Sequence, residues 1–200
     1  LDGGDWRPVA TSQAYGIRRD ASLAPELAQT YVEALDASLA RLDAWLGPGA
    51  RRYQELLLVA SPALQRALVG SSGLVVPTSS SSRSIVLVLP HLAGDGGAEV
   101  AALQARTVLG EPADSWMHVG AGIDAAGTWW GRDLVAWGQH LEELGLLPSP
   151  EQITSAESLD RLSQHVLAPA RGLLWRYLRE TVSREDLREL WSGALGLSVD

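Results

Sequence analysis

Apolar positions in the first half of the chain switch between helical and strand periodicity. Between residues 25 and 46 they recur at helical spacing, and Gly47 follows directly, which predicts one long amphipathic helix laid on a core. Short apolar runs at 55–60, 74–77 and 84–89 are bounded by Gly, Pro and Ser, as buried strands are. The first half therefore predicts a small mixed sheet with helices packed on it.

From residue 98 onward the helical period predominates. Four stretches share it: 99–109, 132–144, 168–180 and 183–191. Few strands followed by a run of helices is typical of the α+β class, so we expect a small mixed sheet with an all-helical C-terminal half. The expected division is a mixed subdomain at 1–125 and a helical subdomain at 126–200, the two forming one continuous fold unit.

Composition and charge narrow the classes of partner. The longest apolar run, residues 85–89, is far too short to cross a bilayer. The net charge is −8 and the arginines are scattered, which argues against a nucleic-acid groove. The chain has no Lys and no Cys, so Schiff bases, P-loops, disulfides and thiolate ligands are excluded. We expect a globular domain that neither binds nucleic acid nor inserts into a membrane.

Histidine is the first place to look for metal or acid–base chemistry. The chain has four: His91, His118, His140 and His165. None is three or four residues from another, so no helix face could offer two imidazoles to a metal. His91 and Asp95 share one predicted loop, and His118 and Asp124 share the next. A folded-together metal site from these residues is one alternative, but structural histidines are the favoured interpretation.

Tryptophan takes the place of the missing phenylalanine. Five of the eight lie in the expected helical subdomain, 126–200: Trp129, Trp130, Trp137, Trp175 and Trp191. Trp130 and Trp137 share a helical stripe with Leu134 and Leu141, a periodicity that favours a Trp-rich core. The other interpretation is an aromatic-lined groove for a ligand or peptide. A purely structural module would have no concave pocket beside these residues.

One segment resembles a motif of a known enzyme family. Trp116-Met117-His118-Val119-Gly120-Ala121-Gly122 is similar to the W-[LM]-x-E-G-x-A motif of peptidase MA-like gluzincins, which are zinc metallopeptidases. The order of predicted elements from about residue 14 to 193 resembles that family too. In it, two His of a preceding H-E-x-x-H helix bind zinc, the Glu between them is the general base, and the Glu of the later motif is the third ligand.

The chain departs from the family at each of these positions. In the register that the order of elements suggests, Leu103 and Thr107 replace the two imidazoles and Gln104 replaces the general base. Val119 replaces the third ligand and follows Thr107 by 12 residues, a short separation for the family. Leucine and valine cannot bind zinc, and a glutamine amide cannot accept a proton from water. The resemblance implies a catalytically inactive domain without a cofactor, acting as a binding or scaffold module.

The resemblance also suggests where a protein or peptide partner would bind. In active relatives the strand before the zinc helix can pair with extended substrate, and an exposed edge at 84–89 could still capture a peptide by strand addition. If that edge is covered, the domain contributes only interaction surface. The candidate binding residues are Ser84, Ile85, Val86, Leu87, Trp116, Trp129 and Trp130. The alternative function is a hydrolase with a relocated metal site built from His91, His118 and a nearby Asp.

Overall fold

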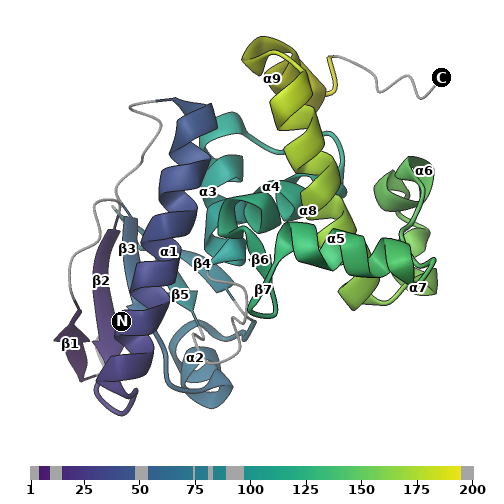
Figure 1. The fold of residues 1–200 in the computed structure, drawn as a ribbon. Helices are drawn as coiled ribbons and strands as arrows, with labels where there is room; N and C mark the ends of the chain where they lie inside the picture. Colours follow the sequence, from purple (N-terminus) through teal and green to yellow (C-terminus); the bar gives the residue numbers. More distant parts are fainter. Residues whose placement is uncertain are drawn as a thin grey trace.

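The computed structural model describes residues 5–9, 15–47, 54–73, 75–80, 83–88 and 97–194. These residues have the predicted α+β fold, with a helical C-terminal half (Figure 1). The elements in chain order are β1 (Trp6–Pro8), β2 (Tyr15–Asp20), α1 (Pro25–Leu46), β3 (Gln54–Leu58), α2 (Pro62–Val69), β4 (Val75–Ser80), β5 (Arg83–Val88), α3 (Ala98–Leu109), α4 (Ser115–Ala126), β6 (Thr128–Trp129), β7 (Arg132–Asp133), α5 (Leu134–Glu143), α6 (Pro150–Thr154), α7 (Ser158–Arg161), α8 (Gln164–Thr181) and α9 (Arg184–Ser192). Within the described ranges, no helix has the length and apolarity needed to cross a membrane.

Local signals place the helices of the first half. Pro25 lies in the first turn of α1, where its missing N–H costs no hydrogen bond, and Gly47 ends the helix at a positive φ. Ser61 begins α2 by accepting a hydrogen bond from the backbone N–H of Leu64 at 3.1 Å. Helix α1 therefore forms where the sequence predicts it.

A five-stranded mixed sheet forms one layer of the molecule, in the order β1-β2-β3-β5-β4. Strands β2, β3 and β5 run parallel, while β1 and β4 pair antiparallel at the two ends. Val86 of β5 thus lies opposite Leu56 of β3 on one side and opposite Pro77 of β4 on the other. This corrects the expectation of an exposed edge at 84–89, because the backbone groups of Ser84, Ile85, Val86 and Leu87 are on a strand paired on both sides. Strand addition at β5 is excluded.

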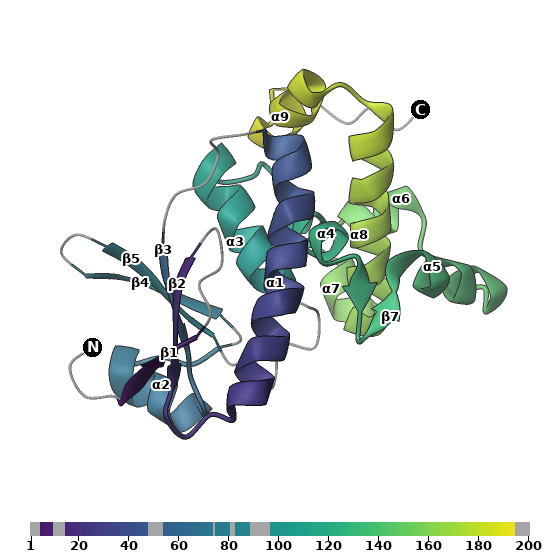
Figure 2. The ribbon, with the colours of Figure 1, turned by 60° about the vertical axis from the view of Figure 1, so that its left-hand side comes forward.

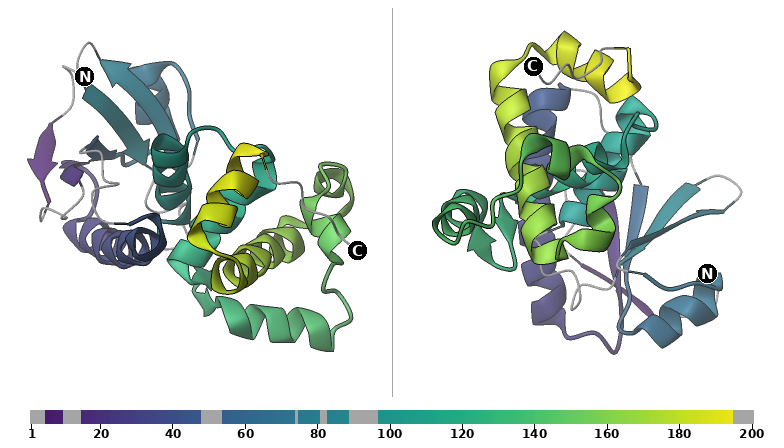
Figure 3. Two further views of the ribbon diagram at one scale, coloured as in Figure 1. Left: turned by 90° about the horizontal axis from the view of Figure 1, so that it is seen from above. Right: turned by 90° about the vertical axis from the view of Figure 1, so that its right-hand side faces the viewer.

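The sheet separates two apolar layers because the side chains of β3 alternate between its faces. Leu56 and Leu58 belong to the main core with α1, α3, α4 and α8. Leu57 and Val59 form a smaller cluster on the other face, covered by α2. Figure 2 shows α1 and α2 on opposite sides of the sheet. In the left view of Figure 3, the green helices α5 and α6 lie on the side of the molecule away from the sheet.

Trp175 of α8 lies at the centre of the main core, where three other tryptophans surround it edge to face. Its ring centroid is 5.6 Å from that of Trp45, 6.2 Å from that of Trp116 and 5.5 Å from that of Trp191. Such T-shaped pairs add to the stabilisation from burial. Trp116 is fully buried in this cluster, which corrects its assignment as a candidate binding residue: it is a core residue.

Helix α4 passes between α3 and α8, and two glycines make this possible. A β-carbon at Gly120 would lie 2.7 Å from the backbone oxygen of Arg171 in α8. A β-carbon at Gly122 would overlap the backbone oxygen of Ala98 in α3. Because residues two apart on a helix point to nearly opposite sides, one glycine admits each neighbouring helix.

A buried carboxylate fixes the C-terminal end of α4. Asp124 is 4% exposed and accepts hydrogen bonds from Nε of Arg176 at 2.8 Å and Nε of Arg179 at 2.7 Å. The hydrogen bond with Asp124 raises the pKa of Arg179, whereas burial lowers the pKa of Arg41. Arg41 of α1 donates to the last two carbonyl groups of α4, where the helix dipole favours a cation. These interactions join α1, α4 and α8.

Gly122→Ala should destabilise the fold, because the added methyl group meets backbone atoms of α3 that cannot move alone. We expect the free energy of unfolding to fall by about 2–3 kcal/mol, measured by urea denaturation. Gly73→Ala is the control. The nearest neighbour of its β-carbon would be a Val76 methyl group at 3.7 Å, which is ordinary van der Waals contact, so the free energy of unfolding should not fall. Equal stabilities for the two variants would contradict the close approach of α3 and α4.

Asp124→Asn should also destabilise the fold, because it leaves two arginines without their shared carboxylate. We expect a loss of about 2–3 kcal/mol, below the range for fully buried pairs because Arg176 and Arg179 keep 21% and 30% of their side chains exposed. Glu180→Gln removes the exposed carboxylate 3.3 Å from the same Arg179 and should cost less than about 0.5 kcal/mol. Denaturant unfolding of both variants measures the difference.

Candidate functional site

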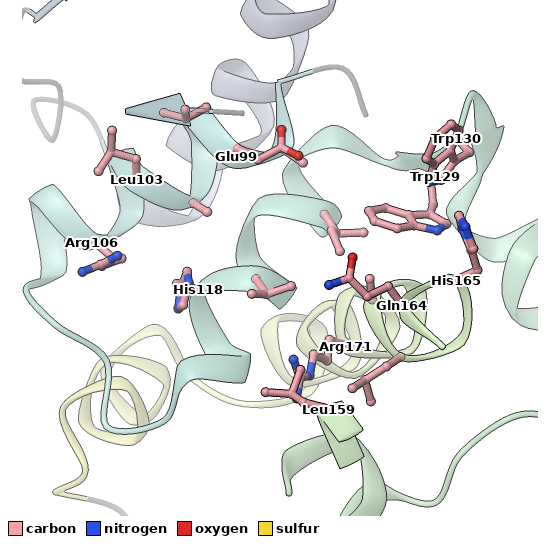
Figure 4. A pocket seen from close by; sticks show the side chains of 17 residues that line it. Glu99, Leu103, Arg106, His118, Trp129, Trp130, Leu159, Gln164, His165 and Arg171 are labelled. Carbon is pink, nitrogen blue, oxygen red and sulfur yellow. The ribbon is translucent and has the colours of Figure 1, made fainter. Parts of the chain in front are cut away.

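A pocket of about 640 Å³ lies where α3, α4 and α8 diverge. The β6–β7 hairpin, Leu159 of α7 and Val75 of β4 complete its walls (Figure 4). Its volume is within the range of small-molecule sites, and most of its lining is apolar. The described part of the chain therefore has a concave site beside two of its tryptophans, Trp129 and Trp130, as the groove interpretation required.

Helix α3 presents one continuous stripe to this pocket. Its five lining residues are Ala98, Glu99, Ala102, Leu103 and Arg106, which lie on one face because the helix has 3.6 residues per turn. Gln104 is buried away from the pocket, and the hydroxyl of Thr107 donates to the backbone oxygen of Leu103 at 2.8 Å. Of the four proposed degenerate zinc positions, the structure brings only Leu103 and Val119 to the pocket.

His118 of α4 lines the pocket, and its surroundings favour the neutral imidazole. Burial lowers its pKa most, and the positive charge of Arg106 lowers it further. Among the described residues its Nδ1 atom has no hydrogen-bond partner. Arg106 pairs with Glu111, whose Oε1 atom lies 2.5 Å from Nη2 of the arginine, and this hydrogen bond lowers the pKa of Glu111. The Nε atom of Arg106 is buried without a hydrogen-bond partner among the described residues.

Arg171 of α8 is the most deeply buried cation of the pocket, with 4% of the residue exposed. Its Nε atom donates to the backbone oxygen of Ile153 in α6 at 3.1 Å. Burial lowers its pKa, and no carboxylate of the described residues offsets that effect. Sequence reasoning missed Arg171, because a single arginine on an amphipathic helix has no distinguishing pattern.

The β6–β7 hairpin holds two tryptophans at the pocket. Its two turn residues, Trp130 and Gly131, have φ of 50° and 72°, the left-handed pair that a tight hairpin turn requires. Trp129 is buried, while Trp130 is 62% exposed with its ring centroid 5.4 Å from that of His165. The helical stripe expected to include Trp130 is therefore incorrect, since α5 begins only at Leu134. Gly131 was the available signal for this turn.

The relocated metal site does not assemble from the residues that the structure describes. His91 and Asp95 lie outside the described ranges. Asp124 is paired with two arginines, so its carboxylate is not available beside His118. His140 is exposed at the surface, where its Nδ1 atom lies 3.9 Å from Oε2 of Glu143. No group of three or more His, Asp and Glu within the described ranges could hold a metal ion.

The site is thus an apolar pocket with one buried cation, a neutral imidazole and a carboxylate on its walls. Its lining unites residues from the two halves of the chain, which local sequence patterns could not have paired. Comparison of the chain with protein-family models, with curated proteins and with solved structures gave no match. The geometry of the pocket and the motif at 116–122 are therefore the features of the chain that bear on its function.

Proposed function

We propose that this chain is a non-catalytic, metallopeptidase-like domain that binds a ligand in the pocket between α3 and α4. One observation carries the proposal. Ala98, Glu99 and Ala102 line the pocket at positions i, i+1 and i+4 of α3, which is the spacing of H-E-x-x-H. Val119, at the position of the third zinc ligand in the resembling motif, lines the same pocket.

This arrangement favours a register five residues earlier than the sequence alone suggested. Alanines at 98 and 102 then replace the two histidines, and Glu99 stands at the position of the general base. Val119 follows Ala102 by 17 residues, which removes the short separation of the first register. Glu99 and Val119 both line the pocket, whereas Gln104 of the first register does not.

The residues at these positions support binding rather than catalysis. Alanine and valine have no lone pair for zinc, and a glutamate base in this family acts on a zinc-bound water. Replacing three polar ligands with Ala98, Ala102 and Val119 instead gives the pocket an apolar wall. A wall of this kind stabilises apolar ligands by excluding water.

A peptide is the partner class that the sheet favours. Strand β4 is at the end of the sheet among the described strands, and its Val75 lines the pocket. A segment that paired with β4 would therefore pass beside the pocket and could place an apolar group in it. In this proposal β4 takes the role that was expected of β5.

Restoring the metal ligands tests both the scaffold and the register. We expect the purified wild-type chain to contain no stoichiometric zinc and to show no peptidase activity. The variant Ala98→His/Ala102→His/Val119→Glu should bind about one zinc per chain, because its three ligands would face one pocket. Metal content after dialysis, measured by atomic emission, gives the stoichiometry.

The matched control is Leu103→His/Thr107→His/Val119→Glu, which introduces the same residue types in the first register. It should bind no stoichiometric zinc, since position 107 does not line the pocket. Thermal unfolding of both triple variants confirms that each is folded. Stoichiometric zinc in the wild-type chain, or in the control variant alone, would overturn the proposal.

A further inference from the structure

We infer that the ligand of this pocket is an apolar carboxylate, whose carboxylate group pairs with Arg171 while its apolar body lies against Trp129 and Trp130. The inference rests on the proposed binding function and specifies the chemistry of the ligand. Its basis is the charge of the pocket together with the apolar character of its walls.

Arg171 is a buried charge without an ionic partner in the described part of the chain. Its one hydrogen bond there is the donation from Nε to Ile153, so the remaining guanidinium nitrogens are left for other acceptors. An isolated buried charge is costly, and proteins normally pair it. The chain has 24 acidic residues against 16 arginines, yet none of those described accompanies this one. An anionic ligand would supply the missing partner.

The balance of charge points to a singly charged anion. Arg106 already pairs with Glu111, so Arg171 is the arginine of the pocket that has no carboxylate partner among the described residues. A carboxylate has one charge and two oxygens that match the guanidinium fork. A phosphate group, with nearly two charges, would exceed what Arg171 can neutralise.

The position of Glu99 separates two regions of the pocket. Figure 4 shows Glu99 on the opposite side from Arg171, with His118 and Gln164 nearer to Arg171. A carboxylate beside Arg171 is therefore remote from the one acidic side chain of the lining. A ligand cation, in contrast, would have to lie against Glu99.

The rest of the pocket fits an apolar body of limited size. Ile123, Leu159 and Leu167 line it together with the two hairpin tryptophans. A volume of about 640 Å³ holds a medium-chain fatty acid or the last residues of a peptide with a free C-terminus. Both sources have the same chemistry, a carboxylate on an apolar body, and the experiment distinguishes them.

Isothermal titration of the whole chain at neutral pH tests this inference with two sets of probes. The first set is octanoate, octanol and octylamine, which share a tail and differ in charge. The second is the peptide acetyl-Ala-Ala-Val-Leu as the free acid and as the C-terminal amide. We expect octanoate or the peptide acid to bind at least about tenfold more tightly than its neutral counterpart.

Variants of Arg171 test whether this residue causes the preference for the charged probe. Arg171→Met keeps a long side chain without charge and should weaken binding of the acid about 30-fold or more, while octanol binding changes little. Arg171→Lys keeps the charge and should retain part of the preference. Arg7→Met is the control, because it removes one arginine from the exposed edge strand β1 and should leave both affinities unchanged. Thermal unfolding checks each variant.

Each outcome decides a separate point. A preference for octanoate alone identifies a fatty-acid-like ligand, and a preference for the peptide acid alone identifies a C-terminus. Equal binding of the charged and neutral probes, or tightest binding of octylamine, overturns the inference that the ligand is a carboxylate. Either result still supports the proposed binding function. Absence of binding by every probe overturns both. If Arg171→Met does not fold, the wild-type series and Arg171→Lys decide the question.

Discussion

The close approach of α4 to both α3 and α8 is the constraint on which the rest of the structure depends. A helix with side chains on all faces needs 8–10 Å between axes, and Gly120 and Gly122 remove the atoms that would hold these helices apart. Once α4 lies in this position, Asp124 reaches the arginines of α8, and Trp116 reaches Trp175. The pocket opens where the helices diverge, so its shape follows from the same contact.

Helix α8 uses arginine in two opposite ways. Arg176 and Arg179 share the carboxylate of Asp124 and join α8 to α4. Arg171, five and eight residues before them, is buried without such a carboxylate among the described residues and lines the pocket. On this one helix, two arginines that join α8 to α4 share a carboxylate, whereas the arginine at the pocket has none among the described residues. The proposed ligand would supply the negative charge that Arg171 lacks at the pocket.

Local patterns in the sequence predicted much of the fold and little of the site. Helix α1 follows from apolar periodicity between Pro25 and Gly47, which requires only neighbouring residues. The two-sided pairing of β5 depends on β3 and β4, and the apolar run at 84–89 does not by itself show which strands lie beside it. The face of α3 that meets the pocket depends likewise on α4 and α8. Leu103 and Val119 therefore line the pocket, whereas Gln104 and Thr107 do not.

Trp175 and the three tryptophans around it have a spectroscopic consequence. Indole rings held edge to face at 5.5–6.2 Å couple their electronic transitions, which should give a strong near-ultraviolet circular dichroism signal from the core. Trp129 and Trp130 stand apart from that cluster, at the pocket, and Trp130 is in contact with solvent. The protein thus has two separate sets of chromophores. The core tryptophans report whether the helices are packed, and the pocket tryptophans report what occupies the pocket.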